Sequence, residues 1–225
     1  MNEYPALTKE EMLVHLDELN QRLEQKGKHG EIILAGGAAL TLVFNARDAT
    51  RDIDAVFAPT DDMREIIKQI ANENDNLSDD WLNDAVKGFV TDKMNYNEFM
   101  SLSNLTVYNI DAEGLLAMKL TSHRVDSNDM DDSIFLMKTL NIDSESQLTD
   151  IVEKYAGRIH QTPTTRFFTM EAFERYKAEK AVLHSEKTNS NFQERLGNAK
   201  VEAQKQNAQA KDASRTCKKQ SSDLS

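Results

Sequence analysis

The chain has 225 residues, of which 39% are hydrophobic and 29% are charged, and its formal net charge is −11. This composition is typical of a globular protein with one sizeable core and a polar appendage. No apolar run reaches the length of a membrane span, and the N-terminal residues lack the basic flank and apolar centre of a signal peptide. The single cysteine excludes an intrachain disulfide and a cysteine-based metal site, so we expect a cytoplasmic protein.

The charge is unevenly distributed along the chain. Residues 1–170 hold 16 Lys and Arg against 30 Asp and Glu, whereas residues 171–225 hold 11 against 8. An acidic body does not suit a general nucleic-acid binder, because phosphate backbones are held by clustered Lys and Arg side chains. A polyanionic substrate would therefore need a local basic patch, metal ions or the C-terminal tail.

The N-terminal part of the chain alternates helices and strands. Thr8 and Glu11 form a capping box that predicts the start of a helix. Apolar residues follow at helical spacing: Met12, Leu16, Leu19 and Leu23. The short apolar run at 31–35 predicts a buried strand that ends in a tight turn, and residues 38–45 predict a short helix packed behind that turn.

A second strand is predicted at residues 52–57, followed by a helix at 61–73. The acidic and amide-rich residues 74–84 predict a loop with a short turn around Trp81. Two further strands are predicted at 85–91 and 102–110.

From residue 111 onward the pattern is helical, with Asp111 as the predicted cap of a helix at 112–124. Two more helices are predicted at about 128–140 and about 145–156. We therefore expect an α+β fold. It would comprise an α/β lobe with a small mixed sheet (1–110), a helical lobe (111–184) and a polar, flexible or loosely helical tail (185–225).

The first two strands place two chemical features together. Gly36 and Gly37, between a strand and a helix, would expose backbone N–H groups to an anion such as a nucleotide phosphate. Asp52 and Asp54 fall on one face of the next strand, where they would repel each other unless a divalent cation bound them. Mg²⁺ prefers carboxylate and phosphate oxygens, so the pattern favours a phosphoryl-transfer site. Taken separately, a plain strand–helix turn and a solvated edge strand also explain these residues.

Two blocks of sequence resemble a known superfamily. Gly36-Gly37, a short helix and then Asp52-Ile53-Asp54 resemble the signature of the polymerase-β-like nucleotidyltransferases. The block from Asp111 to Arg124, with its Leu-Leu-Ala-Met-Lys-Leu run, and the following Asp129-Met-Asp-Asp132 are similar to the C-terminal motif of AbiEii-like abortive-infection (type IV) toxins and their bacterial relatives. Together the two blocks cover about residues 30–160.

The resemblance implies roles for the first block. Asp52 and Asp54 would bind Mg²⁺ or Mn²⁺ as catalytic metal ligands. The backbone around Gly36 and Gly37 would bind the triphosphate of an NTP substrate. The flanking cations, Arg47 and Arg51, would also contact phosphates.

It also implies roles for the second block. Lys119 would act in catalysis by meeting a phosphate or the incoming base, with Arg124 in support. Asp129 or Asp132 would close the site as the distal acid. Simpler explanations remain for all three: a helical lysine often extends along the surface, and acids in a first helical turn favour the helix dipole.

One feature departs from the superfamily pattern. Many members carry a third carboxylate on a later strand, and the strand at 105–110 has none. Asp111 is better explained as a helix cap, and Asp92 is the other candidate. Either Asp129 or Asp132 takes this place, or a second metal is weakly held.

The resemblance implies transfer of NMP from an NTP to an acceptor hydroxyl on RNA, protein or a small molecule. The chain would then be the toxin-like component of a bacterial toxin–antitoxin or phage-defence system, with a cognate antitoxin as partner and no membrane association. Two alternatives remain: a catalytically degenerate fold that serves as a protein-interaction module, and a nucleotidyltransferase of the antibiotic-modifying kind.

Overall fold

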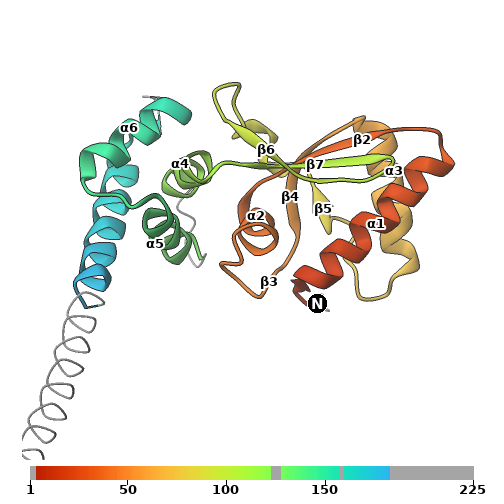
Figure 1. Ribbon diagram of the computed structural model, residues 1–225, viewed down its shortest axis with the longest axis horizontal. Coiled ribbons are helices and arrows are strands. Elements are labelled where there is room, and N and C mark those ends of the chain that lie inside the picture. The colour runs from red at the N-terminus through yellow and green to blue at the C-terminus, as the bar shows by residue number, and fades with distance from the viewer. Residues whose placement is uncertain (1–3, 123–127, 158–159, 183–225) are drawn as a thin grey trace, which may run out of the picture. The chain divides into compact units, whose positions relative to one another are not determined.

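The computed structural model describes residues 4–122, 128–157 and 160–182 (Figure 1). Residues 1–176 form one compact unit, and residues 177–182 are the described part of a second. The predictions for Arg124 and for the tail at 185–225 lie outside the described residues. The lobe boundaries at residues 110 and 184 stay predictions. No helix in the described ranges has both the length and the apolar character needed to cross a membrane.

Strands lie in the first part of the described chain and helices in the second. In chain order the elements are β1 (Leu7–Thr8), α1 (Lys9–Gln25), β2 (Gly30–Leu34), α2 (Gly36–Leu42), β3 (Ala49–Thr50), β4 (Ile53–Ala58), α3 (Thr60–Glu73), β5 (Leu82–Asn83), η1 (Ala85–Gly88), β6 (Tyr96–Ser101), β7 (Leu105–Ile110), α4 (Ala112–Ser122), α5 (Asp129–Leu140) and α6 (Glu145–Tyr155). Residues 163–182 are also helical.

The main sheet has five strands in the order β5-β4-β2-β7-β6. β2 lies at its centre, antiparallel to β4 and parallel to β7. β5 runs parallel to β4 at one edge, and β6 runs antiparallel to β7 at the other. β1 and β3 form a separate antiparallel pair. This mixed sheet with helices confirms the predicted α+β class.

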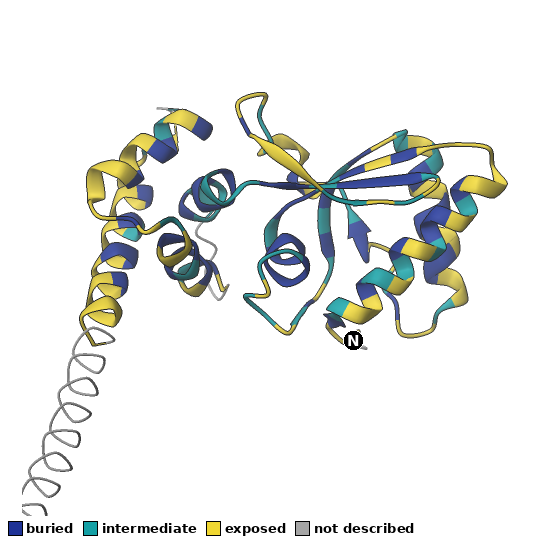
Figure 2. Cartoon of the chain, in the orientation of Figure 1, coloured by how far each residue is buried: buried dark blue, intermediate teal, exposed yellow. Residues whose placement is uncertain are grey.

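α1 and α3 cover one face of the sheet (Figure 1). The capping box is present: the Glu11 N–H donates to Thr8 Oγ1 at 3.3 Å, and the Thr8 N–H donates to Glu11 Oε2 at 2.8 Å. The predicted apolar stripe of α1 is buried, whereas the opposite side of the helix is exposed (Figure 2). Burial alternates along β4, with Ile53 and Ala55 in the core and Asp54 on the other face.

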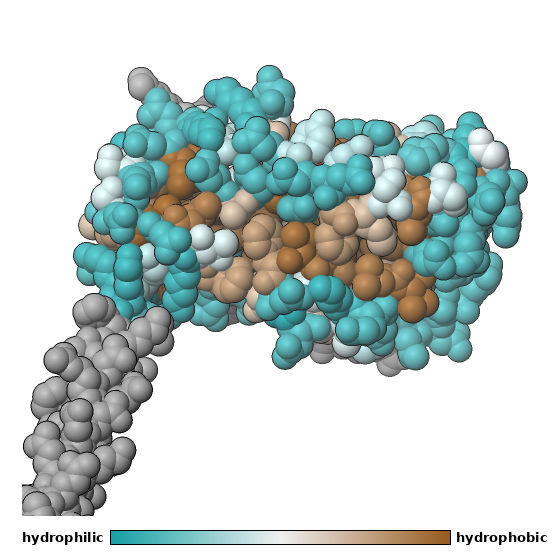
Figure 3. Space-filling view, viewed as in Figure 1, coloured by the Kyte–Doolittle hydropathy of each residue, from teal (hydrophilic) through white to brown (hydrophobic). Residues whose placement is uncertain are grey.

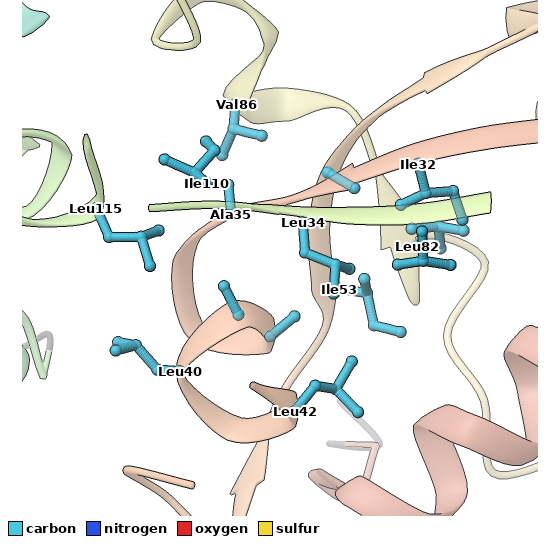
Figure 4. Packing of buried hydrophobic residues seen from close by; sticks show 14 of the residues in the cluster. Ile32, Leu34, Ala35, Leu40, Leu42, Ile53, Leu82, Val86, Ile110 and Leu115 are labelled. Carbon is cyan, nitrogen blue, oxygen red and sulfur yellow. The ribbon is translucent and has the colours of Figure 1, made fainter. Parts of the chain in front are cut away.

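The prediction of a strand at 85–91 is wrong. Residues 85–88 form the 3₁₀ helix η1, and its Val86 packs into the core beside Ala35 and Ile110 (Figure 4). The strand that extends the sheet is β5, and the buried Trp81 before it fixes its place. The Trp81 indole N–H donates to the Ile67 carbonyl at 3.2 Å. A tertiary contact, rather than the local apolar pattern, thus determines which residues pair with β4.

β6 was not expected, because its sequence shows no alternation. Four of its six residues are exposed, and a bulge interrupts its register between Glu98 and Met100. An edge strand with little burial carries no period-2 signal.

The helical part follows the predicted caps. Asp111 Oδ1 accepts the Gly114 N–H at 2.7 Å at the start of α4. Ser144 forms a capping box that opens α6. At the other end of α6, Lys154 donates to Glu113 on α4 at 2.7 Å and lowers the pKa of that carboxyl group. α4 thus packs against both α5 and α6.

Apolar residues also gather on the surface, over the middle of the face seen in Figure 3. The exposed large hydrophobic residues of the first unit are Tyr4, Val14, Phe89, Tyr96, Phe167 and Met170. Phe89 differs from the others in that it also lines a cavity of about 500 Å³.

Candidate active site

A cavity of about 500 Å³ lies where α2, β4, η1 and α4 approach one another. The site residues predicted from the sequence that line it are Gly36, Gly37, Arg47, Arg51, Asp52, Asp54, Lys119 and Asp129. The fold therefore places residues that are about 90 positions apart in the chain around one cavity. Asp132 lies just behind the cavity wall, in contact with two of its cations.

The two glycines allow the turn before α2 to approach β4 and β3 closely. Gly36 has a φ of +54°, and a Cβ at this position would lie 2.7 Å from Asp54 Oδ2. A Cβ at Gly37 would lie 2.5 Å from Thr50 Oγ1. At position 36 only glycine can adopt the positive φ and also lie this close to Asp54. The N-cap residue is Ala35, whose methyl side chain offers no acceptor to the first N–H groups of α2.

The two carboxylates enter the cavity from the start of β4. Asp54 lies on β4 on the face opposite its buried neighbours, and Asp52 immediately precedes the strand. The Ala35 N–H donates to the Asp54 carbonyl at 2.9 Å, which ties β4 to the glycine turn. Asn83 Nδ2 donates to Asp52 Oδ2 at 3.0 Å. The pair is therefore held next to the turn that the glycines form.

Four charged side chains form a network in and just behind the wall of the same cavity: Arg47, Lys119, Asp129 and Asp132. Lys119 Nζ lies 2.7 Å from Asp129 Oδ1 and 2.9 Å from Asp132 Oδ2. Arg47 Nε donates to Asp132 Oδ1 at 2.8 Å, and a second guanidinium nitrogen pairs with Oδ2. The Asp132 side chain is 4% exposed. This charge network joins the segment after α2 to α4 and α5.

The network bears on the simpler explanations of its members. Lys119 does not extend along the surface, since its side chain is only 13% exposed and pairs with two carboxylates. Asp129 and Asp132 do lie in the first turn of α5, but their carboxylates contact Lys119 and Arg47 across the fold. Arg47 also reaches the glycine turn, because a Cβ at Gly37 would lie 3.3 Å from Arg47 Nη1.

The described residues contain no group of three or more His, Cys, Asp or Glu side chains arranged to hold a metal. Asp111 caps α4, and Asp92 is exposed in a turn away from the cavity. Extending the strand register by one residue places the apolar Ile110 in line with Ala35 and Asp54. Two carboxylates nevertheless fit Mg²⁺, which in phosphoryl-transfer sites is commonly held by one or two carboxylates together with substrate phosphates and water.

Sequence reasoning missed two further features of the site. Asn83 contacts Asp52 but stands in an amide-rich segment where no local pattern distinguishes it. Val86, Phe89 and Met118 give the cavity an apolar wall. Phe89 ends η1, the segment that was predicted as a strand. The exposure of the Phe89 ring is a property of the fold, so no local pattern in the sequence identifies this wall.

The comparisons with known proteins agree with this geometry. Residues 11–181, about three quarters of the chain, match the model of a family described as "Nucleotidyltransferase of unknown function (DUF6036)". No curated protein and no solved structure matches the chain. The matched range contains both carboxylates, the glycine turn and all four residues of the charge network. The chain therefore belongs to this family of nucleotidyltransferases.

Proposed function

We propose that the protein transfers a nucleoside monophosphate from an NTP to an acceptor hydroxyl, with Asp52 and Asp54 as ligands of Mg²⁺ or Mn²⁺. The observation that carries the proposal is the shared cavity, which is lined by both carboxylates and by the cations Arg47 and Lys119. When bound, the divalent cation would polarise the attacking hydroxyl and stabilise the leaving pyrophosphate. The acceptor oxygen would bond to the α-phosphorus, the bond from the α-phosphorus to the oxygen that bridges to the β-phosphate would break, and pyrophosphate would leave with that electron pair. The hydroxyl proton would pass to water.

The protein's own groups supply position and charge in this proposal. Because Gly36 has no Cβ, its backbone lies directly beside Asp54, where it would contact a phosphate chain bound at the carboxylates. Arg47 is held by Asp132 through Nε and one terminal nitrogen, and its other terminal nitrogen, Nη1, next to Gly37, would donate to a phosphate oxygen. Lys119 adds a point charge from α4, and Arg51 lines the same space. Catalysis by such a site consists mainly of positioning and electrostatic stabilisation.

The apolar wall suits the nucleobase. Phe89 lines the cavity and is 42% exposed, so its ring is accessible to a ligand. Stacking of a base on an aromatic side chain is worth about 1–3 kcal/mol by alanine substitution. A nucleoside triphosphate, which is polar at one end and flat and apolar at the other, matches a cavity with these two kinds of wall.

Replacing Phe89 by alanine should therefore raise the Kd for NTP by roughly five- to a hundredfold. The Kd for inorganic tripolyphosphate, which has no base, should stay the same. Calorimetry with both ligands measures the difference, and Phe167→Ala, at a 72% exposed phenylalanine outside the cavity, is the matched control. An equal rise in the Kd for NTP and for tripolyphosphate would show that Phe89 maintains the cavity as a whole and does not bind the base.

The role of the chain in a toxin–antitoxin or phage-defence pair belongs to the same proposal, and rests on the resemblance of its two sequence blocks to AbiEii-like toxins. The acidic body favours a protein or small-molecule acceptor over RNA, since a polyanion would be repelled. The absence of a third carboxylate among the described residues is what favours the alternative, a degenerate fold that binds partners without turnover.

One experiment distinguishes these functions. Purified protein is incubated with each labelled NTP, Mg²⁺ and a bacterial lysate, in parallel with an Asp52→Ala/Asp54→Ala double variant. We expect label to pass from one NTP to an acceptor whose size identifies it as RNA, protein or small molecule, and we expect the double variant to transfer none. If neither protein transfers label and neither binds NTP with Mg²⁺, the catalytic proposal is wrong.

A further inference from the structure

The segment from Trp81 to Ala85 is fixed to the protein on both sides of Asn83. Trp81 is fully buried, and its carbonyl accepts the Ile53 N–H at 2.6 Å. Leu82 is buried as well, and β5 places Asn83 directly beside Asp54 in the parallel register. One polar side chain of a rigid segment is thus set next to the carboxylate pair.

Internal contacts settle the orientation of the Asn83 amide. Its Oδ1 accepts the Ala85 N–H at 3.0 Å, a role that only the oxygen of the amide can fill. Its Nδ2 must then face the other way, and it donates to Asp52 Oδ2 at 3.0 Å. A backbone donor therefore determines which end of the amide meets the carboxylate.

Asp52 precedes β4, so the hydrogen-bond ladder of the sheet does not begin until the next residue. A carboxylate at the end of a strand keeps rotational freedom unless a neighbour restricts it. The amide donor of Asn83 restricts that rotation and holds one carboxylate oxygen in a defined place. Hydrogen-bond partners of metal-binding side chains typically contribute ten- to hundredfold to metal affinity.

We infer that Asn83 is a positioning residue, which orients the Asp52 carboxylate for a divalent cation. The inference rests on the proposed function, since it assumes that Asp52 binds the metal. Asn83 itself contacts neither substrate nor metal in this assignment. Its effect on the cation passes through Asp52, so it precedes the binding of any nucleotide or acceptor.

The test measures binding of Mn²⁺ alone, by the loss of the electron paramagnetic resonance signal of the free ion. Asn83→Leu has a similar volume but no donor, and we expect its Kd for Mn²⁺ to rise about ten- to hundredfold. Asn83→Gln keeps an amide donor on a longer side chain and should recover part of the affinity. Asn97→Leu, at an exposed position on the opposite edge strand β6, should bind as the unaltered protein does.

Thermal unfolding of each variant accompanies the binding measurement, and Asn83→Ala replaces Asn83→Leu if the latter does not fold. Equal Mn²⁺ affinity in the unaltered protein and a folded Asn83 variant would overturn this inference and leave the proposed function intact. Failure of the unaltered protein to bind Mn²⁺ at all would instead contradict the metal site on which both rest. Reduced affinity in Asn83→Leu with partial recovery in Asn83→Gln supports the positioning role.

Discussion

Asp54→Asn should reduce the rate of NMP transfer by at least about a hundredfold while leaving the protein folded. Asparagine has the same size as aspartate, so the new side chain fits beside Gly36. The fit is tight there, since a Cβ at Gly36 would lie 2.7 Å from Asp54 Oδ2. The exchange removes one of the two negative charges that would hold the cation. Because like charges repel, loss of one of two adjacent carboxylates relieves repulsion in the metal-free protein. We therefore expect a melting temperature equal to or above that of the unaltered protein.

Single-turnover transfer and thermal unfolding, each measured with and without Mg²⁺, check both parts of this expectation. The unaltered protein should be stabilised by Mg²⁺ together with a non-hydrolysable NTP, because a ligand that binds only the folded state raises its stability. The variant should lose most of this stabilisation. Full transfer activity in Asp54→Asn would exclude the carboxylate pair as the metal site.

Asp132→Ala should lower the free energy of unfolding by about 3–5 kcal/mol, the range found when one partner of a buried ion pair is removed. The Asp132 side chain is 4% exposed and meets both Arg47 and Lys119. Its loss removes a carboxylate that contacts both of these part-buried cations. Chemical denaturation measures the change.

Asp131→Ala is the matched control, because Asp131 lies one residue away in the same helical turn and is exposed. Its removal should change the free energy of unfolding by no more than about 0.5 kcal/mol. Asp132→Asn preserves the shape of the side chain, so its change in the free energy of unfolding should lie between those of Asp132→Ala and Asp131→Ala. A stability loss as small as that of Asp131→Ala would mean that solvent, rather than Asp132, compensates the two cations.

Elements with strong local signals were predictable from the sequence. The capping box at Thr8 and the apolar spacing of α1 specify that helix without any tertiary contact. β4 shows the alternation of a strand with one buried face. The segment at 85–91 was mispredicted because its apolar run resembles a strand, whereas the indole of Trp81 fixes the neighbouring residues 82 and 83 as the strand that pairs with β4.

The candidate site divides in the same way. Asp52 and Asp54 follow from a motif that is local in the chain, and the glycine turn follows from its place between a strand and a helix. The pairing of Arg47 with Asp132 spans 85 positions and needs the packing of α4 and α5, so no local pattern contains it. Asn83 and Phe89 acquire meaning only from what they face, which is a property of the fold.

The charge network also affects which ligands the cavity attracts. Arg47 and Lys119 are paired with the carboxylates of Asp132 and Asp129. Their positive charges are therefore already compensated and attract a polyanion only weakly. A bare phosphate chain would have to displace a carboxylate to gain full contact with either cation. A nucleotide that arrives already complexed with a divalent ion would bring its own positive charge to Asp52 and Asp54. We therefore expect the proposed site to bind the metal complex of a nucleotide more tightly than the free anion.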